Sequence, residues 1–249
     1  MPILIIMKYF VFGLILLISL TALAIGIAAL VITLKGKNTT EIADCTRDYQ
    51  VNPLKQMLKD CKTDEKGGIV FAGDSITELY NLKKWYPDYN VCNRGISGET
   101  TRNVLERFDS TILVMQPKLI VLLIGVNNLH YGLGVESAVN GVESIIINIR
   151  EKLPSCKIIL ESTYPVNRNK TDKFSGYNGI ATNAEIIAIN YKLVELAEKF
   201  DLKCVDMACV LCDENGNFKK DLTVDGLHPD ENGYEVITKK LKPIIDEMI

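Results

Sequence analysis

From Ile69 to the C-terminus, short apolar runs alternate with longer segments in which apolar residues recur every three to four positions. Continuous apolar runs of this kind are typical of strands buried on both faces of a parallel sheet. The expected strands are Ile69–Ala72, Tyr89–Asn93, Leu119–Ile124, Lys157–Glu161 and Lys203–Asp206. The expected helices are Thr101–Met115, Val135–Lys152, Asn183–Phe200 and Glu231–Ile249. This alternation predicts one α/β domain over residues 66–249, in which helices cover both faces of a central parallel sheet and make three layers.

The N-terminal segment has a different composition. Residues 9–34 contain no charged side chain and are bounded by Lys8 and Lys35. About 20 apolar residues suffice to span the hydrocarbon core of a bilayer, whereas the apolar part of a cleaved signal peptide is usually only about 7–15 residues long. We therefore expect residues 9–34 to be an uncleaved transmembrane anchor. The polar residues 35–65 are expected to be a stalk or linker, with a short helix at Pro53–Cys61.

The charges that flank this apolar segment do not decide which side of the membrane the domain faces. Lys8 precedes the segment, and Lys35, Lys37 and Arg47 follow it, which slightly favours a cytoplasmic C-terminal domain. Long domains, however, cross membranes with little regard for their charge. Both orientations stay open on this ground.

Composition argues against several classes of function. The net charge is −3 and no basic patch stands out, so nucleic acid is not an expected partner. The seven cysteines are an odd number and cannot all pair within the chain; Cys45 and Cys61 could form a disulfide if the stalk lies outside the cell. Cys209 and Cys212 have the spacing of a redox or metal pair, but no second such pair and no suitably spaced histidine accompanies them. We expect neither a metal ion nor an organic cofactor.

An acidic residue lies close to one of the only two histidines in the chain. His228 follows Asp225 by three positions, with Gly226 between them and Pro229 directly after. A carboxylate beside a neutral histidine can orient the ring and stabilise the imidazolium that forms when a serine hydroxyl is activated. The alternative is an ordinary polar turn before the last helix. The pair indicates catalysis only if a serine and an oxyanion site accompany it.

The first three expected strands each end in residues suited to such a site. Ser75 follows the first strand directly, although Asp74 or Ser75 could equally be a simple helix cap. The second strand leads into a loop around Gly98, whose backbone N–H groups could face an anion. Asn127 follows the third strand and could donate to an oxyanion, or could serve only as a turn residue. Together these residues supply a nucleophile, an oxyanion hole, a base and an orienting carboxylate.

Four segments resemble the ordered sequence blocks of the SGNH (GDSL-type) hydrolases. They are Gly73–Ile76, Asn93–Thr101, Gly125–Asn128 and Asp225–Pro229. The segments Ile158–Asn167 and Ile187–Asn190 are similar to the acetylhydrolase and carbohydrate O-acetylesterase branch of that family. The resemblance implies a flavodoxin-like three-layer α/β/α fold.

The resemblance also implies a role for each residue of the site. Ser75 would be the nucleophile, His228 the base and Asp225 its partner. The oxyanion hole would consist of the backbone N–H groups of Ser75 and Gly98 and the side chain of Asn127. The third block of the family usually ends in aspartate, where this chain has Asn128. If the aspartate normally fixes this loop, the uncharged Asn128 would fix it less firmly. The nearby His130 is read as a plain loop residue.

The sequence therefore predicts a single-pass membrane protein with a serine esterase domain that acts on an ester of a small molecule or a polysaccharide. The resemblance implies that the ester is an acetyl ester and that the enzyme is a carbohydrate O-acetylesterase. An esterase of polysaccharides on a stalk makes most sense outside the cytoplasm. One alternative is a lipase or lysophospholipase; another, suggested by Asn128, is a binding module without catalysis. The sequence does not predict the oligomeric state.

Overall fold

The computed structural model of the chain describes residues 53–58, 60, 64–168 and 180–249. The predicted transmembrane anchor and most of the predicted linker lie outside these residues. In the part of the chain that is described, no helix has both the length and the apolar character needed to cross a bilayer. Residues 53–58 and 60 are helical, where the sequence predicts a short helix.

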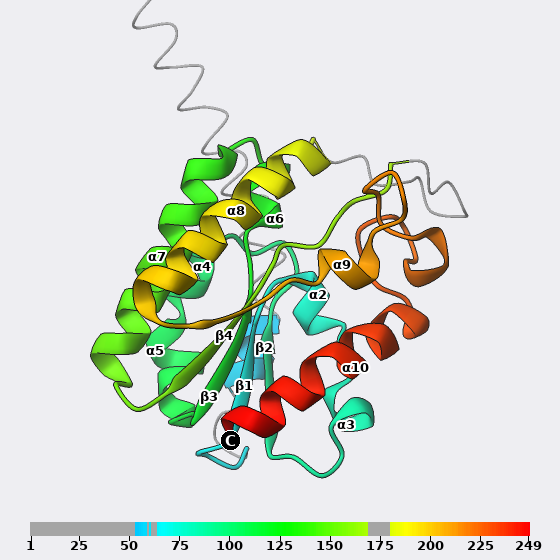
Figure 1. Cartoon of the computed structure of the whole chain (residues 1–249). Helices are drawn as coiled ribbons and strands as arrows, with labels where there is room; N and C mark the ends of the chain where they lie inside the picture. The colour runs from blue at the N-terminus through cyan, green and yellow to red at the C-terminus, as the bar shows by residue number, and fades with distance from the viewer. Residues whose placement is uncertain (1–52, 59, 61–63, 169–179) are drawn as a thin grey trace, which may run out of the picture. The chain divides into compact units, whose positions relative to one another are not determined.

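Five parallel strands form the central sheet (Figure 1), in the order β2-β1-β3-β4-β5. Their bounds are β1 Ile69–Gly73, β2 Val91–Gly95, β3 Leu119–Leu123, β4 Lys157–Glu161 and β5 Lys203–Val205. Gly73 at the end of β1 pairs with Gly95 of β2 and with Leu123 of β3, so these three strands end level with one another. The order is that of flavodoxin-like sheets, in which ligands bind outside the carboxyl ends of the strands where the winding reverses.

Helices lie on both sides of this sheet, which confirms the three-layer α/β architecture. Figure 1 shows α4, α5, α7 and α8 on one side and α3 and α10 on the other. The helices are α2 Ser75–Glu78, α3 Leu82–Trp85, α4 Thr101–Glu106, α5 Phe108–Thr111, α6 Val126–His130, α7 Gly134–Lys152, α8 Asn183–Phe200, α9 Ala208–Leu211 and α10 Glu231–Met248. Two 3₁₀ turns, η1 and η2, cover Leu113–Met115 and Lys220–Leu222.

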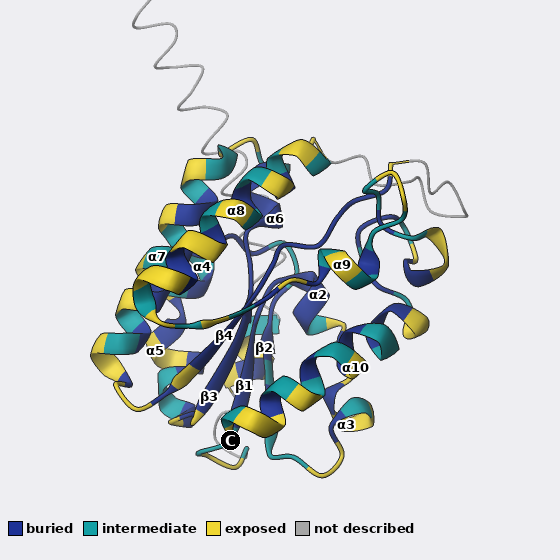
Figure 2. Ribbon diagram, viewed as in Figure 1, coloured by how far each residue is buried: buried dark blue, intermediate teal, exposed yellow. Residues whose placement is uncertain are grey.

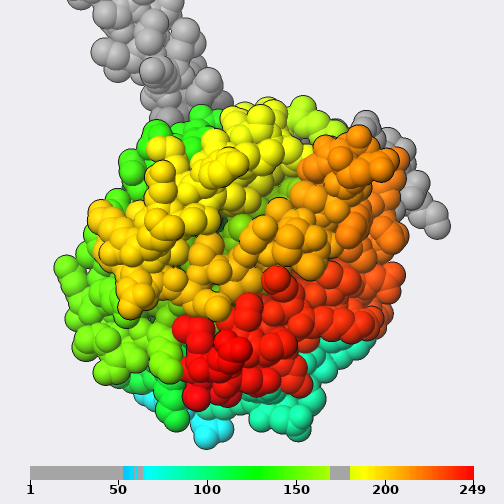
Figure 3. All heavy atoms as spheres, in the orientation of Figure 1, coloured from blue at the N-terminus to red at the C-terminus, as the bar shows by residue number. Residues whose placement is uncertain are grey.

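Burial follows the sequence pattern from which the strands were predicted. All five residues of β1 and all five of β3 are buried, and Figure 2 shows the strands as the most buried part of the domain, with exposed residues on the outer sides of α7 and α8. Seen as spheres, α8 and α10 cover the face of the domain that is turned to the viewer in Figure 3. Each fully buried isoleucine or leucine of these strands contributes about 1.5–3 kcal/mol by leaving water.

The predicted helix Thr101–Met115 is wrong as one continuous element. The structure divides it into α4, α5 and η1, with the first break at Arg107. The hydroxyls of Ser110 and Thr111 both donate to the Arg107 carbonyl, at 3.1 and 2.8 Å, and side-chain bonds of this kind compete with the helical ladder. The Arg107 side chain points into the domain instead of into solvent, and is only 4% exposed.

Candidate active site

Ser75 lies at the point where β1 ends and α2 begins. The side chain of Asp74 caps α2 by accepting a hydrogen bond from the Ile76 backbone N–H at 3.1 Å. Gly95 allows the end of β2 to approach this turn, because a Cβ at Gly95 would lie only 2.2 Å from the Glu78 backbone nitrogen. Ser75 is 9% exposed, so most of this residue is shielded from solvent.

The loop before α10 presents His228. Thr223 and Pro229 pair as an antiparallel bridge, and the Val224 backbone N–H donates to the His228 carbonyl at 2.9 Å. The Thr223 hydroxyl donates to the same carbonyl at 2.7 Å. Asp225 accepts from the backbone N–H of His228 at 2.8 Å and from that of Leu227 at 2.9 Å. The turn therefore fixes both the carboxylate and the histidine.

Helix α10 holds this loop against α2. The Tyr234 hydroxyl donates to the Ile76 carbonyl at 2.8 Å, and the hydroxyls of Tyr80 and Thr238 are 2.6 Å apart. The rings of Tyr80 and Tyr234 are stacked with their centroids 4.7 Å apart. These contacts fix the start of α10, and with it the histidine loop, relative to the helix that begins with Ser75.

The structure brings Ser75, His228 and Asp225 together in one chain of contacts. Nε2 of His228 lies 2.9 Å from Oγ of Ser75, and Nδ1 lies 2.6 Å from Oδ2 of Asp225. Burial opposes ionisation of Asp225, but the hydrogen bonds from the ring and the backbone of His228 outweigh it and lower the pKa of Asp225 to about 2. Asp225 is therefore charged at neutral pH, which keeps a proton on Nδ1 and leaves Nε2 free to accept one from Ser75.

Gly98 and Asn127 lie on either side of Ser75, because β1 is the strand between β2 and β3. Gly98 has φ +77°, which favours glycine, and its carbonyl accepts from the Tyr131 hydroxyl at 3.2 Å. Asn127 donates from Nδ2 to the Glu99 carbonyl at 2.9 Å, which ties the two loops together. Within the described residues, the backbone N–H groups of Ser75 and Gly98 and the second N–H of the Asn127 amide have no protein acceptor, so these donors are free for a ligand.

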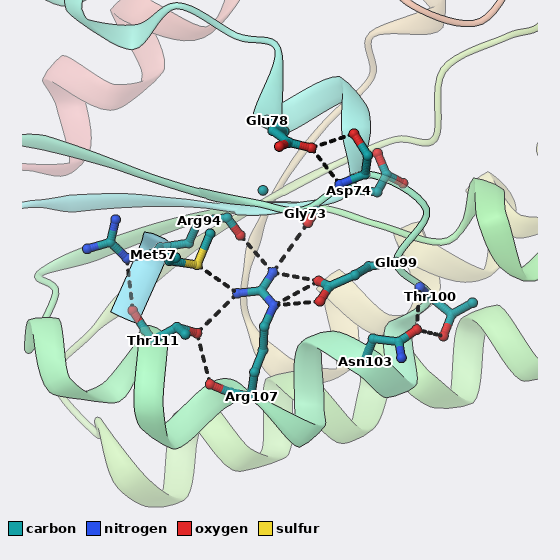
Figure 4. A network of polar contacts seen from close by, with 12 residues as sticks. Met57, Gly73, Asp74, Glu78, Arg94, Glu99, Thr100, Asn103, Arg107 and Thr111 are labelled. Carbon is teal, nitrogen blue, oxygen red and sulfur yellow. Dashed lines mark hydrogen bonds and ion pairs between the residues drawn. The ribbon is translucent and has the colours of Figure 1, made fainter. Parts of the chain in front are cut away.

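A buried ion pair lies under these loops (Figure 4). Arg107 donates from Nε to both carboxylate oxygens of Glu99 at 2.8 Å, and the two side chains are 4% and 3% exposed. The same guanidinium donates to the carbonyl of Arg94 at 2.8 Å and to that of Gly73 at 3.4 Å. One cation thus connects the ends of β1 and β2 with the loop that follows Gly98.

Glu78 fixes the other side of that loop. Its carboxylate accepts from the Ser97 backbone N–H at 2.6 Å and also from the Ser97 hydroxyl. Asn93 holds the same region from below, donating to the Thr77 carbonyl at 2.6 Å and accepting from the Gly95 N–H at 2.9 Å. The backbone around Gly98 is therefore anchored on two sides.

Asn128 retains a hold on its loop in place of the usual aspartate. Its Oδ1 accepts from the Thr101 backbone N–H at 3.1 Å, at the start of α4. Its Nδ2 donates to the hydroxyls of Thr101 and Ser137, both at 3.1 Å. The concern that an uncharged residue would loosen the loop is not supported, because all the amide's polar atoms have partners. His130 is half-buried, burial lowers its pKa, and its ring contacts that of Tyr131.

Sequence reasoning missed Asp74, Glu99 and Arg107 as parts of the site. Charged residues in amphipathic segments are normally read as surface residues, and no spacing pattern links Glu99 to Arg107. Nowhere in the described ranges do three or more His, Cys, Asp or Glu side chains form a group that could hold a metal ion. Cys209 and Cys212 are free thiols, and Cys45 and Cys61 lie outside the described residues.

The chain is similar in sequence to a known protein family and to curated proteins. The sequence profile of the GDSL-like lipase/acylhydrolase family matches residues 71–236. The platelet-activating factor acetylhydrolase IB subunit alpha2 of Homo sapiens is 28% identical over 208 residues, which cover 81% of this chain and 86% of that protein.

The fold of this chain is also similar to solved structures of other proteins. A platelet-activating-factor protein from Streptococcus pneumonia is 29% identical, with a TM-score of 0.72 over 83% of this chain and 99% of that chain. An acetylxylan esterase from Geobacillus stearothermophilus shares the fold, with a TM-score of 0.54 at 20% identity over 72% of this chain and 95% of that chain. Because the family profile covers more than half of the sequence, including the segments that carry Ser75, Asp225 and His228, the chain belongs to the GDSL-like lipase/acylhydrolase family and is a serine ester hydrolase.

Proposed function

We propose that this protein hydrolyses esters of short acyl groups, acetyl above all, with Ser75 as nucleophile, His228 as base and Asp225 as the carboxylate that orients the base. The observation that carries this proposal is the chain of contacts from Ser75 Oγ through both ring nitrogens of His228 to Asp225, at 2.9 and 2.6 Å. A serine hydroxyl in such an arrangement can lose its proton as it attacks a carbonyl carbon.

The reaction proceeds in two halves. Ser75 Oγ bonds to the ester carbonyl carbon while its proton passes to Nε2 of His228, and the carbonyl electron pair becomes an oxyanion. His228 then gives the proton to the leaving alcohol, and an acyl-enzyme results. A water molecule next gives a proton to His228 and attacks the acyl carbon, which releases the acid and returns the proton to Ser75.

The oxyanion would be held by the backbone N–H groups of Ser75 and Gly98 and by the Asn127 amide. The support for this assignment is that these donors follow three neighbouring strands that end level, with Ser75 just after the middle strand. Losing one donor of such a site typically costs about 10²–10³ in rate. Asn127→Ala should therefore lower kcat on p-nitrophenyl acetate by that factor, with little change in KM; an unchanged kcat would remove Asn127 from the hole.

Replacing the nucleophile tests the core of the proposal. Ser75→Ala should abolish hydrolysis of p-nitrophenyl acetate and labelling by a fluorophosphonate probe. Ser144→Ala, on the exposed side of α7, is the matched control and should retain both. Activity retained by Ser75→Ala would overturn the assignment, and a wild-type protein that neither hydrolyses nor takes up the probe would favour the binding-module alternative.

The acetyl preference is supported by the named activity of the human relative, a platelet-activating factor acetylhydrolase subunit. For the alcohol part, the likeness of Ile158–Asn167 and Ile187–Asn190 to carbohydrate O-acetylesterases favours a sugar or polysaccharide. Rates on acetylated xylo-oligosaccharides and on acetyl and octanoyl p-nitrophenyl esters test both parts. A faster rate on the octanoyl ester would contradict the acetyl assignment.

One observation favours a lipid as a second candidate alcohol. Leu133 and Ile180 are 50% and 60% exposed, and Ile180 approaches Gly132, which follows the Tyr131 that is bonded to Gly98. Apolar side chains at the rim of an ester site suit an apolar leaving group. Faster hydrolysis of an acetylated lysophospholipid than of acetylated xylo-oligosaccharides would select this candidate.

We also propose that residues 9–34 anchor the protein in a membrane and that the hydrolase domain lies outside the cytoplasm. The support for the anchor is the length of this uncharged apolar segment. The side rests on the fit between a stalked esterase and an external polysaccharide. Protease added to intact cells should degrade the domain; protection of the domain until the cells are permeabilised would place it in the cytoplasm.

A further inference from the structure

Asp74 is a carboxylate that the reaction described above does not use. It lies between the end of β1 and Ser75 and is 1% exposed. One oxygen, Oδ1, caps α2 through the Ile76 N–H at 3.1 Å. The other, Oδ2, is buried and has no hydrogen-bond donor among the described residues. A neutral capping residue would satisfy the helix equally well, so the cap does not account for a buried acid at this position.

Among the described residues, the ionisable group that favours the charged form of Asp74 is His228, which becomes a cation when it takes a proton. Glu99 acts against the Asp74 charge, and it occupies Arg107 through a bidentate contact. Tyr234, from α10, has its pKa raised by burial first and by the neighbouring carboxylates next, so it stays neutral. The ring of His228 is the remaining ionisable group that favours a negative Asp74.

Two further carboxylates act, together with Asp74, on Tyr234. Asp225 is held charged by its bonds to His228. Glu161, at the end of β4, is buried and bonded to the Tyr164 hydroxyl at 2.6 Å, and burial raises its pKa to about 7. Burial likewise raises the pKa of Asp74 to about 7, while the Ile76 N–H and His228 act in the opposite direction. Near neutral pH the Asp74 carboxyl can therefore exist in both forms.

We propose that Asp74 is a second carboxylate for His228, whose buried negative charge stabilises the imidazolium that forms when His228 takes the proton of Ser75. This inference rests on the function proposed above. Asp74 acts through His228 and touches no reacting atom. In the resting site its charge has no permanent counterion, whereas in the transition state the imidazolium supplies one, so the interaction is stronger in the transition state than before it.

The variant Asp74→Asn isolates the charge from the cap. Its amide oxygen can still accept from the Ile76 N–H, so the cap is kept while the charge is lost. We expect kcat on p-nitrophenyl acetate to fall about tenfold, the effect of about 1.4 kcal/mol on a barrier, with KM unchanged.

Asp206→Asn is the matched control. Asp206 also follows a strand end and also accepts from the backbone N–H two residues on, at 2.8 Å to Ala208, but it is exposed. It should leave kcat unchanged. Asp74→Ser, a second neutral capping variant, should lose activity in the same way as Asp74→Asn if the latter fails to fold.

The outcomes separate this inference from the proposed function. If Ser75→Ala is inactive but a folded Asp74→Asn or Asp74→Ser keeps the wild-type kcat, Asp74 is only a helix cap and the inference fails. If Ser75→Ala is as active as the wild type, the proposed function fails first. A tenfold fall in kcat with an unchanged KM supports the inference.

Discussion

The buried pair of Arg107 and Glu99 allows a stability prediction with a defined dependence on pH. In Arg107→Met, the Glu99 carboxylate would remain 3% exposed without its cation. Removing one partner of a buried pair costs about 3–5 kcal/mol, because an unbalanced charge stays in the interior. The Arg94 carbonyl, which accepts from Arg107 at 2.8 Å, also loses its side-chain donor.

The loss of unfolding free energy in Arg107→Met depends on pH, because Glu99 can bind a proton when its cation is removed. Burial already raises the pKa of Glu99 above its ordinary 4.5, and Arg107 opposes that rise. Without Arg107 the folded pKa rises further, so the folded variant holds a proton that the unfolded chain releases above pH 4.5. Holding it costs up to about 1.4 kcal/mol for each pH unit between 4.5 and the folded pKa, so the loss relative to wild type grows as pH rises.

Urea unfolding followed by circular dichroism at pH 8 and pH 5.5 measures this difference. Arg107→Met should lose about 4 kcal/mol relative to wild type at pH 8 and clearly less at pH 5.5. Arg102→Met is the matched control, since Arg102 and Glu106 form an exposed pair whose side chains are 85% and 56% exposed; its loss should stay below about 1 kcal/mol at both values. Equal losses for Arg107→Met at the two pH values would refute the reasoning.

Three further predictions concern the loops of the site. Asn128→Asp keeps the acceptor for the start of α4 and should change the free energy of unfolding by less than about 1 kcal/mol, whereas Asn128→Ala should cost about 1–3 kcal/mol in the same urea assay. Gly95→Ala forces a Cβ to within 2.2 Å of the Glu78 nitrogen and should prevent recovery of soluble, active protein; Gly216→Ala, in open space, should cost about 1 kcal/mol. Asp225→Asn should lower kcat on p-nitrophenyl acetate about 10³–10⁴-fold. In wild type, the charged Asp225 contributes stability that is lost as pH falls from about 4 toward the pKa of about 2, and the variant should lack this contribution.

The sequence was sufficient for the parts of the fold that depend on apolar periodicity. The helix predicted at Asn183–Phe200 has those bounds in the structure, and α10 ends one residue before its predicted end. The short helices α3, α6 and α9 were not predicted, because four or five residues are too few to show a period, and α2 was anticipated only through a possible cap at Asp74 or Ser75. Their bounds depend on local caps, such as Asp74 for α2.

The limits for the site have another physical origin. Ser75, Asp225 and His228 could be chosen because strand ends and a short spacing mark them in the sequence. Glu99, Arg107 and the buried role of Asp74 depend on where α5 and the loop around Gly98 pack in three dimensions. A charged residue is stable inside a protein only with a partner, and the sequence does not show which residues become partners.

The distance in sequence between Ser75 and His228 gives the site a strict requirement for the whole domain. Ser75, the proposed nucleophile, follows β1. His228, its proposed base, lies in a loop held by the last helix, through Tyr234 to Ile76 and Thr238 to Tyr80. A shift of α10 by 1 Å would stretch the 2.9 Å contact between Ser75 and His228 beyond hydrogen-bonding range. The stacked and bonded tyrosines between α2 and α10 are thus part of the catalytic geometry as well as of the core, and substitutions there should lower activity before they unfold the protein.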